Sequence, residues 1–196
     1  MLFMIGVKME LSEYKTLIHQ LAESGSNKVF YNQDAQHAEI VLTEIFEKSK
    51  ETIRIFAAQL NDNPPVSDDY VRKLSDFIER GGKVRILLNK YEQQNVLKSE
   101  LFKRLAFYVL KEKDIQVKKT SATVYYTNDP DKKELHFTLG DSFIYRIETD
   151  VQERMAEGSF NNDVVAKKFI DMFDKLFAEG EYIDLINLFN LSLDAE

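Results

Sequence analysis

Four polar side chains in the second half of the chain have the types and spacing of a small reactive site. Glu134, His136 and Thr138 alternate with apolar residues, so they lie on one face of a predicted strand. Arg146 belongs to the next predicted strand, and a tight hairpin turn would place that strand beside the first. An imidazole near a guanidinium can bind phosphate, and it can also take part in phosphoryl transfer. We therefore interpret the hairpin as a candidate phosphate or nucleotide pocket.

Two other interpretations of these residues stay open. The alternating polar side chains could instead form the solvent face of a hairpin. Glu134, His136 and Glu148 could in principle bind a metal, but their spacing matches no metal motif, so we expect neither a metal nor a cofactor. His19 and His37 fall on predicted helices among polar neighbours, where we expect them at the surface.

Length and composition indicate one α/β domain. The chain has 196 residues, of which 44% are apolar and 30% charged, as in ordinary globular proteins. Cysteine is absent, which excludes disulfides, thiolate metal sites and cysteine nucleophiles. This composition fits a reducing compartment, and we expect a cytoplasmic protein. The apolar stretch Met1–Ile5 is too short to cross a membrane and lacks a basic flank, so we expect an edge strand or a docking segment there.

The charge is unevenly distributed along the chain. The net charge of −7 argues against broad nucleic-acid binding. Residues 98–133 nevertheless hold nine Lys or Arg against five Asp or Glu. A local basic face could contact nucleic acid through Lys118, Lys119, Lys132 and Lys133. The alternative is that these lysines are simply solvated.

The stretch from Thr52 to Asn89 determines the expected architecture. Two short β-branched runs, predicted as strands over 53–58 and 84–88, flank an amphipathic helix. Ser67 can cap the start of this helix, and Gly81 can end it in the left-handed conformation. Two strands joined by a helix form a crossover with adjacent parallel strands. We expect this unit at the centre of the sheet.

The same patterns predict the remaining elements. Helices are expected over 12–22 and 34–50, over one long segment bearing Leu97, Leu101, Leu105, Tyr108 and Val109, and from Asn161 or Asn162 to Gly180. Strands are expected over 29–31, 114–118, 123–126, 134–139 and 142–148, and at Ser159-Phe160. A last short amphipathic helix carries the apolar stripe Tyr182, Leu185, Ile186 and Phe189. This stripe would cover the chain's own core, a second copy or another protein, and we favour a second copy.

This order of elements resembles one module of the phospholipase D superfamily. The stretch Phe77–Leu88, with its Gly-Gly-Lys-Val-Arg core, and the helix Phe169–Phe177 are of the family's type. The resemblance covers residues 35–182 and implies a mixed sheet with helices on both faces. It divides the chain into an N-terminal extension over 1–31, a phospholipase D-like domain over 32–181 and a C-terminal helix over 182–196.

The family's catalytic signature is incomplete in this sequence. It consists of a histidine, a lysine two residues later and an aspartate five further on. His136 matches, but Thr138 replaces the lysine and Phe143 replaces the aspartate. The resemblance implies chemistry through a phosphohistidine, and loss of the lysine removes the charge that would stabilise its transition state. Gly158–Asn161 imitates the family's later Gly-Ser-x-Asn element at a longer spacing, and we interpret it as a strand end and a helix cap.

Three functions follow as hypotheses. The first is a non-catalytic phospholipase D-like module for protein interaction or ligand sensing, as a homodimer or as part of a prokaryotic regulatory or defence system. The second is a divergent phosphodiesterase or nuclease that uses His136 and Arg146. The third is a nucleic-acid-binding module that uses the lysines of residues 98–133. The missing lysine and aspartate favour the first over the second, and the acidic net charge disfavours the third.

Overall fold

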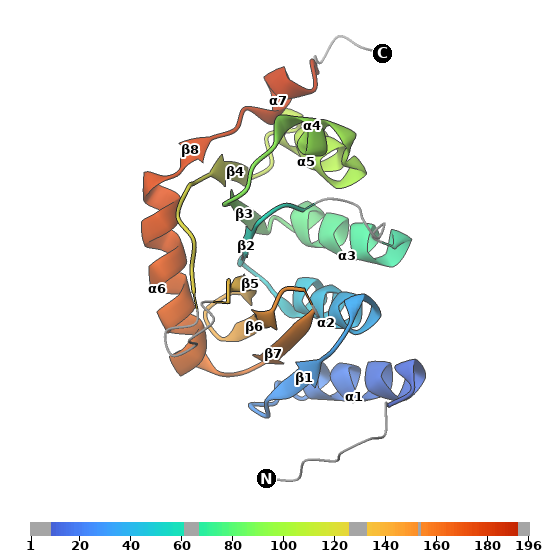
Figure 1. Ribbon diagram of the computed structural model, residues 1–196. Helices are drawn as coiled ribbons and strands as arrows, with labels where there is room; N and C mark the ends of the chain where they lie inside the picture. The colour runs from blue at the N-terminus through green and yellow to red at the C-terminus, as the bar shows by residue number, and fades with distance from the viewer. Residues whose placement is uncertain (1–8, 61–66, 126–132, 153, 192–196) are drawn as a thin grey trace.

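One mixed sheet of eight strands runs through the described part of the protein (Figure 1). The computed structural model describes residues 9–60, 67–125, 133–152 and 154–191. The strand order is β1-β7-β6-β5-β2-β3-β4-β8, in which β2, β3 and β4 are parallel and the other pairs are antiparallel. The strands are β1 (Phe30–Asn32), β2 (Thr52–Ala57), β3 (Lys83–Leu88), β4 (Ile115–Lys119), β5 (His136–Gly140), β6 (Ile144–Asp150), β7 (Met155–Ser159) and β8 (Glu181–Tyr182).

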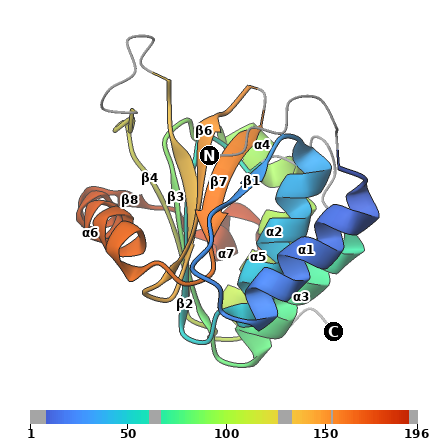
Figure 2. The ribbon, with the colours of Figure 1, turned by 90° about the horizontal axis from the view of Figure 1, so that it is seen from below.

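Helices cover both faces of this sheet, as expected for the α/β architecture (Figures 1 and 2). One face carries α6 (Asp163–Glu179), which packs through Ala166 and Phe173 on Phe137 and Ile147 of the hairpin. The other face carries α1 (Leu11–Glu23), α2 (Ala35–Lys48), α3 (Asp68–Glu79), α4 (Gln93–Lys98) and α5 (Glu100–Leu110). The core therefore has two layers, one on each side of the sheet.

The central unit predicted from the sequence is confirmed. β2 and β3 are adjacent and parallel, with Ile53 paired to Val84. α3 connects them, and the Ser67 hydroxyl accepts a hydrogen bond of 3.2 Å from the Tyr70 amide at its start. Gly81 ends the turn after α3 with a φ of +90°. Since L side chains rarely adopt this φ, glycine suits the position.

Gly82 allows the closest approach in this unit. A Cβ atom placed on Gly82 would lie 2.3 Å from the Cζ atom of Phe77, which is far too short for a real contact. Phe77 is fully buried in the core between α3 and the sheet. The Gly-Gly pair that resembles the family motif therefore has two separate roles, one for backbone conformation and one for packing.

Two expected elements differ in the structure. The long helix predicted after Asn95 is interrupted at Ser99, which has extended backbone at a ψ of 120°. The Ser99 hydroxyl accepts from the Phe102 amide and so starts α5 as a separate helix. The strand predicted over 123–126 is reduced to a single bridge between Tyr125 and Glu134, and residue 126 lies outside the described part.

Two residues of the C-terminal stripe, Leu185 and Phe189, pack on the chain's own core, so the expectation that they cover a second copy is wrong. β8 pairs with β4 before α7 (Leu185–Leu188) begins. Leu185 is 2% exposed within the core cluster beside α5, and Phe189 packs partly buried against the same cluster. Tyr182 remains 52% exposed. The sequence pattern showed that these apolar side chains need a surface to pack on, but not that the chain's own core provides that surface.

The structure describes only part of the N-terminal segment for which the sequence gives expectations. Residues 1–8, which include the Met1–Ile5 stretch, lie outside the described residues. In the described part, α1 and β1 fall close to the helix and strand predicted there. Across the described ranges, every helix is too short or too polar to cross a membrane.

Candidate functional site

The hairpin of β5 and β6 brings the predicted site residues together. His136 lies directly opposite Glu148, and Thr138 lies directly opposite Arg146. Residues paired in this way on antiparallel strands present their side chains to the same face. The neighbouring Phe137 faces the α6 side instead. The four polar side chains consequently form one patch on the face covered by the N-terminal helices.

This patch is buried, so the solvent-face interpretation of the hairpin is wrong. His136, Glu148 and Arg146 are 9%, 8% and 4% exposed. Arg146 Nη2 donates to Glu148 Oε1 at 3.1 Å, and His136 Nδ1 lies 3.5 Å from Glu148 Oε2. Buried charges are stable only when they are paired and hydrogen-bonded. Glu148 therefore links the imidazole to the guanidinium.

The surroundings of Glu148 keep its carboxylate ionised. Burial, the largest influence, raises the pKa of this group because it disfavours the charged form. The contacts with His136 and Arg146 act in the opposite direction, and together they lower the pKa of Glu148 below its ordinary value. The centre of the site is therefore the negative charge of Glu148, paired with the positive charge of Arg146.

A ring nitrogen of the site lacks a partner in the described part of the chain. His136 Nε2 is shielded from solvent and has no hydrogen-bond partner among the described residues. Arg146, beside it, uses Nε and Nη2 for its bonds to Asn32 and Glu148. An unsatisfied buried polar atom costs roughly 1–3 kcal/mol. A ligand that reached His136 Nε2 would remove that cost.

Asn32 completes the site, and sequence reasoning missed it. Its Oδ1 accepts a hydrogen bond of 3.0 Å from Arg146 Nε, and its Nδ2 donates one of 2.8 Å to the Arg154 carbonyl. Asn32 is buried on β1, which reaches the site by pairing with β7. Nothing near Asn32 in the sequence indicates this role. The only available signal was a polar residue at the end of a short predicted strand.

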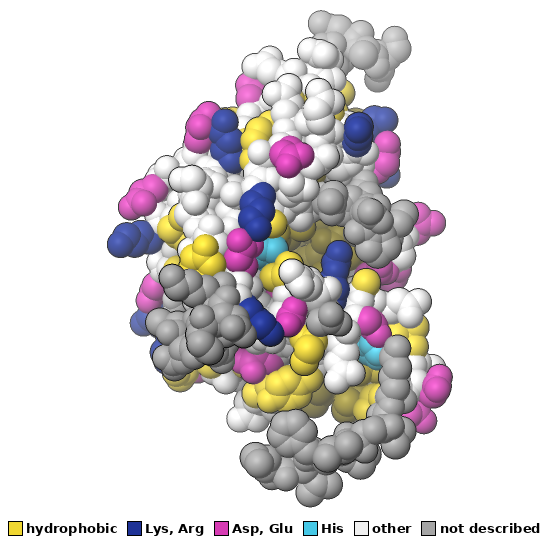
Figure 3. All heavy atoms as spheres, viewed as in Figure 1, with side chains coloured by type: hydrophobic (Ala, Val, Ile, Leu, Met, Phe, Trp, Pro, Cys, Tyr) yellow, Lys and Arg dark blue, Asp and Glu magenta, His cyan; other side chains and the backbone are white. Residues whose placement is uncertain are grey.

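A cavity of about 290 Å³ lies beside these side chains, in the size range of small-ligand pockets. Figure 3 shows a histidine near the middle of this face, with both basic and acidic side chains around it. Among the described residues, the cavity is lined mainly by apolar side chains, and the polar ones are Gln59, Tyr70, His136, Thr138, Arg146, Glu148 and Arg154. A few converging polar groups in an apolar cavity are typical of a binding site.

The other predicted ligands are not part of this cavity. Glu134 binds Lys90 at 2.8 Å instead and does not line the cavity. Within the described ranges, no cluster of three or more His, Asp and Glu side chains could hold a metal ion.

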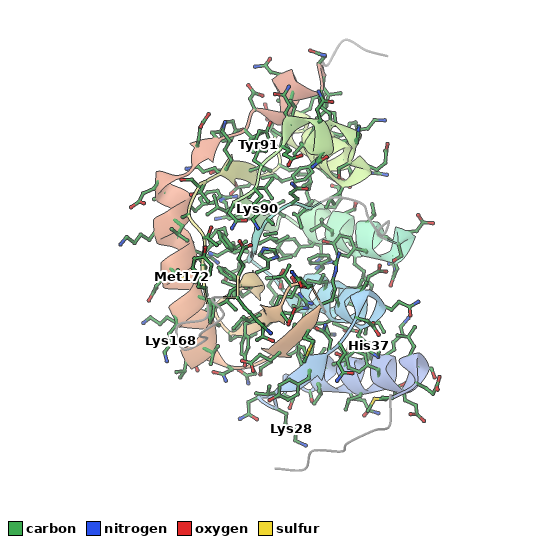
Figure 4. The ribbon with its side chains drawn as sticks, in the orientation of Figure 1. Lys28, His37, Lys90, Tyr91, Lys168 and Met172 are labelled. Atoms are coloured by element: carbon green, nitrogen blue, oxygen red, sulfur yellow. The ribbon has the colours of Figure 1, made fainter. Side chains whose placement is uncertain are left out.

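The two helical histidines lie elsewhere. His19 is largely exposed, with Nδ1 2.9 Å from Glu44 Oε1. The surface position expected for His37 is wrong, because its ring packs edge-on against Tyr14 with 4.2 Å between centroids and is buried. His37 lies on the α1 side of the molecule, well apart from Lys90 (Figure 4).

The lysines considered for nucleic-acid binding contact the chain itself. Lys118 donates to the Phe177 carbonyl at 2.8 Å, Lys119 pairs with Glu181 at 2.9 Å, and Lys133 pairs with Asp150 at 2.8 Å. Lys132 lies outside the described residues. These contacts reduce the positive charge that the segment can offer to a phosphate backbone.

Comparison with solved structures places this architecture among known folds. Nuc from Salmonella typhimurium, a phospholipase D family member, matches over 80% of this chain and 97% of its own, with a TM-score of 0.54 and 14% identity. NucT from Helicobacter pylori matches over 80% and 99%, with a TM-score of 0.54 and 12% identity. The chain has a phospholipase D-like fold.

A third structural match comes from a longer protein. The archaeal chromatin protein TrmBL2, described as having a novel mode of DNA binding, matches over 88% of this chain and 60% of its own, with a TM-score of 0.56 and 17% identity. No protein-family model and no curated protein sequence matches the chain.

The residues that depart from the phospholipase D-like signature have structural roles here. Phe143, in the position of the family's aspartate, packs against the core cluster of α1 and α2. Ser159 ends β7, with Oγ 3.4 Å from the Ser26 carbonyl oxygen, and does not line the cavity. Asn162 caps α6 by accepting from the Val165 amide at 3.1 Å. The Gly158–Asn161 stretch is therefore a strand end that leads into a capped helix, as the sequence indicated.

Proposed function

We propose that the chain is a non-catalytic phospholipase D-like module that senses a small phosphate-bearing ligand in the cavity beside His136. The observation that carries this proposal is the buried His136, whose Nε2 has no partner among the described residues in the wall of a 290 Å³ cavity. A protein interior rarely keeps such an atom unless a water, an ion or a ligand satisfies it.

The charges around the cavity favour an anion. Among the described residues, its lining holds two arginines, Arg146 and Arg154, and one carboxylate, Glu148. Glu148 is already paired with Arg146, so its repulsion of an incoming anion is reduced. Phosphate accepts hydrogen bonds from a guanidinium group and from a ring N–H of an imidazole.

The same residues argue against turnover. Phosphoryl transfer needs a nucleophile, a positive charge on the transferring group and an acid for the leaving group. Thr138 stands where the family has its lysine, and Arg146 is held by Asn32 and Glu148. The described lining of the cavity contains a single histidine. Binding without cleavage is the function that this set of groups supports best.

Ligand sensing is a role that suits a module of a regulatory system. The partner of such a module is a protein or a nucleic acid. TrmBL2, which has a similar fold, is described as a DNA-binding chromatin protein. We therefore assign the module to a regulatory system, including defence against foreign nucleic acid, with another protein as partner. The ligand would act by changing how this module contacts its partner.

Calorimetry and thermal unfolding with inorganic phosphate test the proposal. Phosphate should raise the melting temperature of the wild-type chain and should fail to raise that of His136→Gln. Glu134→Gln is the matched control, because Glu134 belongs to the same segment but lies outside the cavity. Turnover of bis-p-nitrophenyl phosphate that disappears in His136→Gln would establish an enzyme instead. Equal behaviour of all three proteins towards phosphate would refute the binding site.

A further inference from the structure

The turn between β6 and β7 forms part of the cavity wall. Val151 and Arg154 of this turn both line the cavity. The pairing of β6 with β7 is irregular between Glu148 and Asp150, so the end of β6 departs from a regular ladder. Such irregularities often redirect a side chain next to a functional site. Here the irregularity directly precedes the turn that carries Val151 and Arg154.

Arg154 has two unusual properties. Its φ is +54°, in the left-handed region that an arginine rarely adopts. Arg154 is an exposed residue, and in the described part of the chain its side chain has neither a hydrogen-bond nor an ion-pair partner. The positive charge of Arg154 therefore lies at the exposed edge of the cavity and is unpaired there, whereas that of Arg146 lies in the buried wall and is paired with Glu148.

Asn32 fixes the backbone of Arg154 and the side chain of Arg146 together. Its amide nitrogen donates to the Arg154 carbonyl at 2.8 Å, while its amide oxygen accepts from Arg146 Nε at 3.0 Å. Because Asn32 is buried, both bonds are shielded from competing water. One side chain thus sets the relative position of the two arginines across the cavity.

We propose that Arg154 is a specificity-determining residue and Asn32 its positioning residue, and that together they select ligands with two linked anionic groups. This inference rests on the proposed function, because the first anionic group would bind beside Arg146 and His136. The second group would bind Arg154 at the rim. The class is therefore that of diphosphates and phosphorylated carboxylates, in preference to phosphate alone.

Titration calorimetry with orthophosphate and pyrophosphate, at equal ionic strength, tests this inference. The wild-type chain should bind pyrophosphate at least tenfold more tightly than orthophosphate. Arg154→Gln should abolish that preference, because the pyrophosphate affinity should fall much further than the orthophosphate affinity when the contact to the second anionic group is lost. Asn32→Ser should also reduce the preference, because the turn is no longer held.

A second variant separates binding from folding. Arg154→Gly removes the guanidinium and also suits the left-handed backbone, so its melting temperature should equal or exceed that of the wild type. Its pyrophosphate preference should nevertheless be lost. Retention of the preference in Arg154→Gly and Arg154→Gln would overturn the inference while leaving the phosphate site intact. If neither anion binds the wild-type chain, the proposed function itself fails.

Discussion

Arg146 and Glu148 are neighbours on one face of β6, and they form a buried ion pair with 3.1 Å between Nη2 and Oε1. Their spacing of two residues places both side chains on the same face of the strand. His136 from β5 and Asn32 from β1 then bind the outer atoms of the pair. Side chains from three strands, β1, β5 and β6, therefore meet at this buried ion pair.

Replacing that carboxylate should destabilise the protein strongly. Glu148→Gln keeps the shape but leaves the buried Arg146 charge uncompensated, so unfolding free energy should fall by about 3 kcal/mol. The matched control is Glu181→Gln, which removes the exposed partner of Lys119 and should cost less than about 1 kcal/mol. Urea unfolding followed by circular dichroism measures both. Equal losses in the two variants would contradict a special role for the buried pair.

The contribution of Glu148 should also depend on pH. Its pKa is lowered in the folded state, so the stabilisation is complete above the ordinary value of 4.5 and is lost as the pH falls through the lower folded value. The difference in unfolding free energy between wild type and Glu148→Gln should therefore be constant from pH 7 to about 5 and shrink below about pH 4. Urea midpoints across this range measure it, and a difference that grew as the pH fell would argue against the shift, because that is the behaviour of a carboxyl whose folded pKa is raised.

The contact between Phe77 and Gly82 gives a prediction about the core. Phe77→Ala should lower the unfolding free energy by about 3–5 kcal/mol, because it removes a fully buried ring. Gly82→Ala should also destabilise, because its methyl group would overlap the Phe77 ring. In the double variant the second substitution should cost much less than it does alone. Additive costs, measured by urea unfolding, would show that the overlap is relieved elsewhere.

The C-terminal segment should stabilise the chain from within. Leu185→Ala should cost about 2–5 kcal/mol, because Leu185 is buried in the core. Tyr182→Ala, at an exposed position of the same stripe, should stay within about 0.5 kcal/mol of the wild type. The urea midpoint of the full chain should not change with protein concentration. A midpoint that rose with concentration would restore the dimer interpretation, since association stabilises by mass action.

The sequence predicted well wherever periodicity and local caps determine the structure. The unit from β2 to β3, the hairpin of β5 and β6, and the start of α6 at Asn162 all follow from such signals. The break at Ser99 was missed, because the apolar spacing continues across it and only the backbone departs from the helix. β8 was missed because two residues carry too little pattern to indicate a strand.

The candidate site was predictable only in part, for a similar reason. Strand alternation placed His136, Thr138 and Arg146 on one face, but it did not show whether that face meets water or helices. The burial comes from α2 and its neighbours packing over the sheet, which is a property of the whole fold. Asn32 and Arg154 enter through β1 and a turn, where no local pattern marks them.

The bond between Asn32 and Arg146 also bears on how the protein is made. It joins positions separated by 114 residues, and among the described strands β1 pairs only with β7. During synthesis from the N-terminus, β1 leaves the ribosome long before its partner strand exists. Contacts of such large sequence separation form late, because the entropy of closing the loop must be overcome first. The central β2–β3 unit can assemble while translation continues, whereas the cavity becomes complete only after β7 has emerged. Nascent chains that are released before this point would therefore lack both the complete cavity and the α6 layer of the core.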